Sequence, residues 1–164
     1  MGALQGQVDS LRLVSHSEEE TRRIGSELGK LVQAGDLILL TGELGTGKTC
    51  LAQGLARGLG IVEPTPSPSF VLVREYQGRH TLYHLDFYRL EEKEIEEMGL
   101  EDYLSRKGVC VVEWAEKGLK LLPPEHLLVE LWHLSQGERR LRFSAYGERH
   151  VKLLSELKKR WNWP

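Results

Sequence analysis

The chain has 164 residues, of which 40% are hydrophobic and 28% are charged, and its formal net charge is −2. This composition is typical of a folded globular protein and excludes both a disordered chain and a membrane-embedded one. The near-neutral charge also argues against a protein that binds nucleic acid unaided. We expect a single domain over residues 1–164. Because the first residues show no secretory pattern, we also expect a location in the cytoplasm.

The first part of the chain predicts a strand, a helix and a second strand. Residues 11–14 alternate between apolar and polar side chains, as a half-buried strand does. Ser17, with Glu20 three residues later, matches the capping box that begins a helix, and the helical spacing of apolar residues continues until near Gly35. Residues 36–40 are mainly apolar without alternation, which indicates a strand covered on both faces, as in a parallel α/β sheet.

The next segments predict a helix, a stiff loop and a hairpin. Apolar residues recur at helical spacing over residues 51–59, and the helix ends at a glycine. Residues 63–69 contain three prolines, which discourage a helix and favour an extended loop. Residues 70–76 and 81–88 resemble strands joined by a short turn that contains glycine, so we expect them to pair antiparallel.

The remaining segments complete an alternating α/β pattern. Residues 91–103 predict a helix broken at its glycine, and residues 109–112 predict another buried strand. Residues 127–134 and 140–146 flank a second hairpin turn, and a closing amphipathic helix follows. These elements predict an α/β fold whose sheet mixes parallel and antiparallel strands.

Gly42–Thr49 matches the nucleotide-binding P-loop pattern, and it has the required strand before it and helix after it. Without glycine side chains, successive N–H groups can turn inward around phosphate oxygens, and the following helix adds a partial positive charge. We expect Lys48 to reach the β and γ phosphates and Thr49 to offer its hydroxyl to Mg²⁺. The residues expected to surround the nucleotide phosphates are Glu43, Leu44, Gly45, Thr46, Gly47, Lys48, Thr49 and Cys50.

Two acidic residues at the ends of predicted strands are candidates for holding the metal or positioning the attacking water. Asp86 lies in the segment Leu-Tyr-His-Leu-Asp-Phe-Tyr, and Glu113 ends the apolar run of residues 109–112. The sequence does not decide which of them contacts Mg²⁺ directly. Trp114, beside Glu113, can pack against the nucleotide or fill the core, and physical reasoning alone favours the core.

The hydroxyl groups of the proline-rich loop are candidates for sensing the terminal phosphate. Thr65, Ser67 and Ser69 all lie in this loop, and segments that order around a γ-phosphate occur in other phosphate hydrolases. The alternative is an ordinary surface loop.

Several ordered motifs resemble the TsaE family, the P-loop ATPases of bacterial threonylcarbamoyladenosine (t6A) tRNA modification. The motifs are Ser67-Pro68-Ser69-Phe70, Tyr83 to Leu90, Met98-Gly99-Leu100 and Val112-Glu113-Trp114. The resemblance covers the chain from about Thr21 to Pro123. It implies a P-loop NTPase-like three-layer fold with a mixed, partly antiparallel central sheet.

The resemblance also implies a function and a role for each candidate residue. The expected activity is ATP hydrolysis with Mg²⁺, in support of t6A modification together with TsaB and TsaD, with tRNA contacted only through that complex and no membrane involved. It implies that Lys48 and Thr49 bind phosphate and Mg²⁺, Glu113 joins the metal shell, Asp86 activates or orients water, and Trp114 lies by the nucleotide.

Two other functions stay open beside this one. One is a nucleotide-gated binding module in which ATP orders residues 63–69 and hydrolysis is not essential. The other is a small-molecule kinase, although no paired-arginine lid follows the core strands. A guanine-specific GTPase is disfavoured because the chain has a single asparagine, Asn162, and therefore no N-K-x-D segment.

Overall fold

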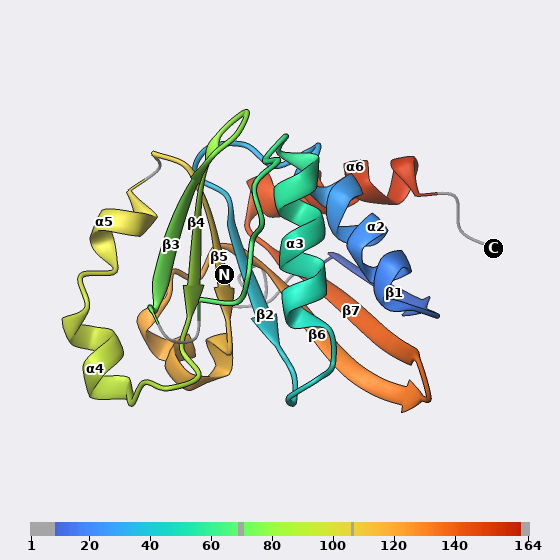
Figure 1. Cartoon of the computed structure of the whole chain (residues 1–164). Helices are drawn as coiled ribbons and strands as arrows, with labels where there is room; N and C mark the ends of the chain where they lie inside the picture. Colours follow the sequence, from blue (N-terminus) through green and yellow to red (C-terminus); the bar gives the residue numbers. More distant parts are fainter. Residues whose placement is uncertain (1–8, 69–70, 106, 162–164) are drawn as a thin grey trace, which may run out of the picture.

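The computed structural model describes residues 9–68, 71–105 and 107–161, and a seven-stranded sheet lies at the centre of this part (Figure 1). The strands are β1 (Asp9–Ser15), β2 (Leu37–Thr41), β3 (Val73–Gln77), β4 (Thr81–Asp86), β5 (Val109–Glu113), β6 (His126–Ser135) and β7 (Glu138–Tyr146). The helices are α2 (Glu18–Gly29), α3 (Lys48–Gly58), α4 (Glu92–Glu97), α5 (Glu101–Leu104), the 3-10 helix η1 (Ala115–Leu121) and α6 (Glu148–Arg160).

The sheet is mixed, as the sequence predicts. Its strand order is β1-β7-β6-β2-β5-β4-β3, with β2 parallel to both β5 and β6, and β4 parallel to β5. The pairs β3–β4, β6–β7 and β1–β7 are antiparallel, and the first two are the predicted hairpins. The C-terminal ends of β2, β4 and β5 therefore meet at one edge, where Leu40 and Asp86 both lie beside Glu113.

Helices cover both faces of the sheet, which confirms the predicted three layers. Ile38 and Leu40 of β2 belong to a core with α2, α3 and α6, while Leu37 and Leu39 belong to a second core with α4, α5 and η1. Figure 1 shows α2 and α3 side by side over the sheet, with α4 and α5 beyond β3. Burial on both faces explains why β2 is apolar without alternation.

Helices α2 and α3 approach each other so closely that their backbones touch. A Cβ atom added to Gly54 would lie 2.0 Å from the carbonyl oxygen of Arg22, and one added to Gly25 would lie 2.3 Å from that of Leu51. Gly29 and Gly58 make the same kind of contact one turn further on. Only glycine fits at these positions, and the contact holds the start of α2 beside the start of α3.

Helix α2 ends earlier than predicted. The sequence places its end near Gly35, whereas the structure ends it at Gly29. The guanidinium of Arg79, on the β3–β4 turn, donates to the carbonyl oxygens of Gly29 and Val32, both at 3.0 Å. The carbonyl oxygens at the end of α2 are thus satisfied by a side chain from a distant segment. A local sequence pattern does not reveal such a partner, so it does not predict where the helix ends.

Two further predictions concern segment boundaries. The predicted break within residues 91–103 is confirmed, because Gly99, at φ 77°, separates α4 from α5. The strand predicted over residues 70–76 begins instead at Val73, because Leu72 has a φ of 71° that a strand cannot adopt, and Phe70 lies outside the described residues. Among the described residues, no helix has the length and apolar character needed to span a bilayer.

Candidate functional site

The loop between β2 and α3 presents an uncapped helix N-terminus. Gly42 and Gly47 have φ angles of 143° and 107°, a backbone region that glycine adopts readily. Gly47 is the N-cap of α3 and provides no side-chain hydrogen bond to the first turn. The first N–H groups of α3 and the partial positive charge of the helix are therefore left for an anion.

Lys48 is buried in this loop and points back into it. Its Nζ donates to the carbonyl oxygens of Gly42 and Glu43, the latter at 2.8 Å, and lies 4.1 Å from the ring centre of Trp114. Burial lowers the pKa of Lys48, and the nearby carboxylate of Glu116 opposes that shift. A phosphate that enters the loop would replace the two carbonyls as the partner of the ammonium group.

A hydrogen-bond chain joins the loop to the end of β5. The Thr49 hydroxyl donates to Oε1 of Glu113 at 2.9 Å, and Nε2 of His84 lies 2.6 Å from Oε2 of the same carboxylate. Glu113 is 2% exposed and His84 is 1% exposed. His84 thus fixes the orientation in which Glu113 faces Thr49. The sequence alone does not reveal this role, because it depends on the pairing of β4 with β5.

Asp86 lies next to Glu113, at the end of the neighbouring strand. It is 1% exposed, and its Oδ2 accepts from the Ser67 hydroxyl at 3.0 Å while Oδ1 accepts from the N–H of Tyr88 at 2.8 Å. The contact with Ser67 ties the proline-rich loop to the site. Of the other predicted loop hydroxyls, Thr65 is not among the residues that line the cleft, and Ser69 lies outside the described residues.

These groups surround a cleft of about 380 Å³ at the C-terminal edge of the parallel strands. The residues predicted to surround the nucleotide all line this cleft except Glu43 and Thr46. The Thr46 hydroxyl instead donates to the carbonyl oxygen of Glu43 at 2.8 Å, which closes the loop on itself. The two predicted acids, Asp86 and Glu113, line the cleft as well.

Trp114 belongs both to the cleft and to the edge of the core. Its ring lies 4.8 Å from the ring of Tyr88 and beneath the ammonium group of Lys48, and one side packs on the core between the sheet and α4. Its φ of 58° turns the chain sharply after β5. The predicted core packing is thus observed on one side of the ring, and a position beside the nucleotide stays a prediction.

Arg139 also lines the cleft, although no sequence motif marks it. It lies at the start of β7, is 7% exposed, and its Nε has no hydrogen-bond partner among the described residues. A Cβ atom added to Gly47 would come within 2.5 Å of its guanidinium. One sequence feature does point to it. Arg139, Leu141 and Phe143 occupy every second position of β7 and share its buried face, so a charged side chain stands in a buried apolar row.

The donors in the cleft suit Mg²⁺ better than a softer metal. The Thr49 hydroxyl and the Glu113 and Asp86 carboxylates are oxygen donors, which Mg²⁺ prefers. Within the part of the chain that the structure describes, no group of three histidine, cysteine or acidic residues is arranged to hold a metal alone. Mg²⁺ fits this arrangement because it keeps several water ligands and takes others from phosphate.

An uncapped, glycine-rich loop between a buried parallel strand and a helix, with acids at the ends of neighbouring strands, defines this chain as an α/β protein of the P-loop-like class. The family model described as "Threonylcarbamoyl adenosine biosynthesis protein TsaE" matches residues 15–141. The chain belongs to the TsaE family.

Similar proteins support this assignment across most of the chain. The tRNA threonylcarbamoyladenosine biosynthesis protein TsaE of Bacillus subtilis is 40% identical over 145 residues, which cover 88% of this chain and 91% of that protein. The protein of the same name from Treponema pallidum is 42% identical, covering 80% and 98%. The crystal structure of Bacillus subtilis YdiB superposes with a TM-score of 0.85 at 35% identity, covering 95% of this chain and 99% of YdiB.

Proposed function

We propose that this chain binds and hydrolyses ATP and thereby supports t6A modification of tRNA, acting with TsaB and TsaD and contacting tRNA only through that complex. Membership of the TsaE family supports the pathway, since the similar proteins are named for threonylcarbamoyladenosine biosynthesis. The observation that carries the hydrolytic part is the 2.9 Å contact between Thr49 and Glu113. It brings the phosphate loop and a strand-end carboxylate to one point.

The proposed binding of the triphosphate uses the N–H groups and the cations that border the loop. The first N–H groups of α3 point to the cleft, and Lys48 exchanges the carbonyls of Gly42 and Glu43 for β- and γ-phosphate oxygens. Arg139 adds a second cation beside Gly47. A buried guanidinium with an unpartnered Nε is well suited to a phosphate, because phosphate oxygens accept charge-assisted hydrogen bonds.

The proposed metal position lies between Thr49 and Glu113. Mg²⁺, when bound there, neutralises part of the charge on the β and γ phosphates. The Thr49 hydroxyl would turn its oxygen toward the ion, and the Glu113 carboxylate would hold the ion or one of its waters. His84 keeps Oε1 of Glu113 directed at that point by binding Oε2.

Asp86 is the proposed acceptor of the water proton. Its carboxylate is buried beside Glu113 and borders the same cleft. As the water oxygen bonds to the terminal phosphorus, its proton passes to Asp86 and the bond from that phosphorus to the bridging oxygen breaks, which yields ADP and phosphate. The Ser67 contact links Asp86 to the proline-rich loop, so occupancy of the cleft can alter that loop.

Phosphate release by the Lys48→Ala variant tests the proposal. We expect hydrolysis of ATP with Mg²⁺ to fall by about 10²–10³-fold, because a cation that stabilises transition-state charge is lost. Lys117→Ala is the matched control, since Lys117 donates to the carbonyl of Tyr88 nearby but does not line the cleft. Equal rates for Lys48→Ala and the parent, with or without TsaB and TsaD, would contradict the proposal.

The Asp86→Asn variant separates the hydrolytic role from simple nucleotide-gated binding. It should still bind ATP, measured by calorimetry, while multiple-turnover t6A formation with TsaB and TsaD is lost. Undiminished t6A formation by this variant would show that hydrolysis is not essential and would favour the binding-module alternative.

A further inference from the structure

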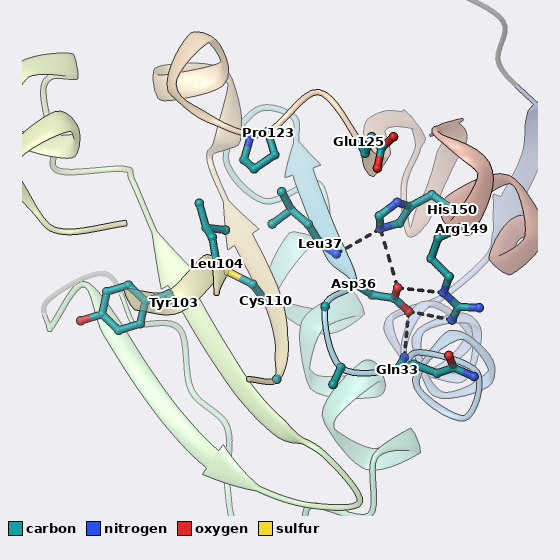
Figure 2. A pocket seen from close by; sticks show the side chains of 13 residues that line it. Gln33, Asp36, Leu37, Tyr103, Leu104, Cys110, Pro123, Glu125, Arg149 and His150 are labelled. Atoms are coloured by element: carbon teal, nitrogen blue, oxygen red, sulfur yellow. Dashed lines mark hydrogen bonds and ion pairs between the residues drawn. The ribbon is translucent and has the colours of Figure 1, made fainter. Parts of the chain in front are cut away.

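A second pocket lies at the opposite edge of the sheet, at the N-terminal ends of β2 and β5. Its volume is about 230 Å³, and we call it the N-edge pocket. Leu37 and Cys110 lie between its two sides; Leu104 of α5 forms one side and His150 of α6 the other (Figure 2). Because β2 has five residues, the pocket and the nucleotide cleft are about 15 Å apart.

One of the two acids that line the N-edge pocket, Asp36, is already neutralised within the protein. Both oxygens of the Asp36 carboxylate accept from Arg149, at 2.9 Å and 2.8 Å, and Oδ2 also accepts from the N–H of Gln33. Figure 2 shows this network beside the pocket. Asp36 therefore does not offer a free charge to a cation, and a ligand must be recognised by another group.

His150 offers that group. Its Nε2 accepts from the N–H of Leu37 at 3.1 Å, so in the neutral ring the proton lies on Nδ1. Burial lowers the pKa of His150, which favours the neutral ring. The residue is 4% exposed, and Nδ1 has no hydrogen-bond partner among the described residues. A buried N–H without an acceptor is unfavourable and rare in native proteins.

The size and charge of the pocket limit what can accept this hydrogen bond. A cavity of about 150 Å³ holds benzene, and sites for drug-sized ligands begin near 300 Å³. A volume of about 230 Å³ thus suits a single ring with a small substituent. The carboxylate of Glu125 lines the pocket and disfavours an anionic acceptor, while the guanidinium of Arg149, which also lines it, is already bound to Asp36. A neutral carbonyl meets both conditions.

We propose that the N-edge pocket binds a small, neutral, one-ring aromatic amide. The amide carbonyl accepts from Nδ1 of His150, the amide N–H groups face Glu125, and the ring packs against Leu104 and Cys110. Nδ1 is covered by other protein atoms. Figure 2 shows the exposed side chain of Glu125 beside the His150 ring, and the proposed binding requires this side chain to shift and admit the carbonyl. The site uses no residue of the nucleotide cleft and stands apart from the proposed ATPase function.

Nicotinamide is a suitable probe, added to the full chain labelled with ¹⁵N. We expect saturable shifts of the imidazole nitrogens of His150 and of amides around the pocket. Nicotinate has the same ring with a carboxylate in place of the amide. Its affinity should be lower by about tenfold or more, because Glu125 repels the carboxylate. Lys48→Ala should bind nicotinamide as the parent does, which separates this site from the nucleotide cleft.

Two variants complete the test. His150→Phe removes the donor, and Leu104→Trp fills the pocket from α5 without touching the bond between His150 and Leu37. Each should weaken nicotinamide binding about tenfold or more. No saturable shift up to the solubility limit of nicotinamide would mean that Nδ1 meets water only and would overturn the proposal. Unchanged binding in folded Leu104→Trp would overturn it equally.

Discussion

The two edges of the parallel strands each bury an acid, but they treat its charge differently. At the C-terminal edge, Glu113 is held by the Thr49 hydroxyl and the His84 ring. At the N-terminal edge, Asp36 is held by the permanent cation of Arg149. Both acids are 2% exposed, so burial does not distinguish them. The partners do: the charge of Asp36 is matched by a guanidinium, whose removal would leave an uncompensated buried charge, whereas Glu113 is held by a hydroxyl and an imidazole.

The largest expected effect follows from removing the cation at the N-terminal edge. Arg149→Ala leaves Asp36 buried without its counter-charge, and we expect the free energy of unfolding to fall by about 3–5 kcal/mol. Urea denaturation measures the change. Arg142→Ala is the matched control, because its contact with Glu130 is also 2.8 Å long but Glu130 is 25% exposed. The control should cost about 1 kcal/mol or less. Similar losses in the two variants would remove the proposed contrast.

An intermediate effect is expected at the C-terminal edge, on activity more than on stability. His84→Phe removes the group that orients Glu113, and we expect ATP hydrolysis or Mg²⁺ affinity to fall by about 10–100-fold. The Mg²⁺ concentration needed for half-maximal rate should rise, which a general loss of folded protein would not cause. His84→Gln retains an N–H donor and should restore part of the loss. An unchanged Mg²⁺ dependence in folded His84→Phe would show that Glu113 needs no such partner.

The smallest of the three effects is a pH dependence that arises at the N-terminal edge. Burial lowers the pKa of both His150 and His126. For His150, the carboxylates of Asp36 and Glu125 oppose this shift, and the guanidinium of Arg149 adds to it. The unfolded chain therefore takes up more protons as pH falls below about 6.5, and stability is lost in that direction.

The test compares urea midpoints between about pH 7.5 and pH 5.5, above the range in which ordinary carboxyl groups titrate. His126→Gln should reduce the dependence, since one of the two histidines is gone. If His126→Gln instead steepens the loss of stability on acidification, the His126 ring is stabilised in its charged form, contrary to its lowered pKa.

Local sequence patterns predict much of the fold and part of the site, and pairing between distant segments explains the rest. Glycine spacing and the flanking strand predict the phosphate loop, and the turn residues predict both hairpins, because each signal lies within one short segment. The contact of His84 with Glu113 depends on the register of β4 with β5, and the position of Arg139 beside Gly47 depends on the strand order of the whole sheet.

The end of α2 shows the same limit. Its apolar spacing continues past Gly29, but Arg79, fifty residues further along the chain, binds the carbonyl of Gly29. Sequence periodicity reports which face of a helix is buried, whereas the terminus depends here on a tertiary partner.

The backbone contact between α2 and α3 has a mechanical consequence. With Gly25 and Gly54 each pressed against the opposite main chain, neither helix can slide or roll past the other without a steric clash. We therefore expect a displacement of Lys48 at one end of α3 to move the two helices together. At its far end, α2 leads into the segment that carries Asp36, so the paired helices span the sheet from the phosphate loop to its opposite edge.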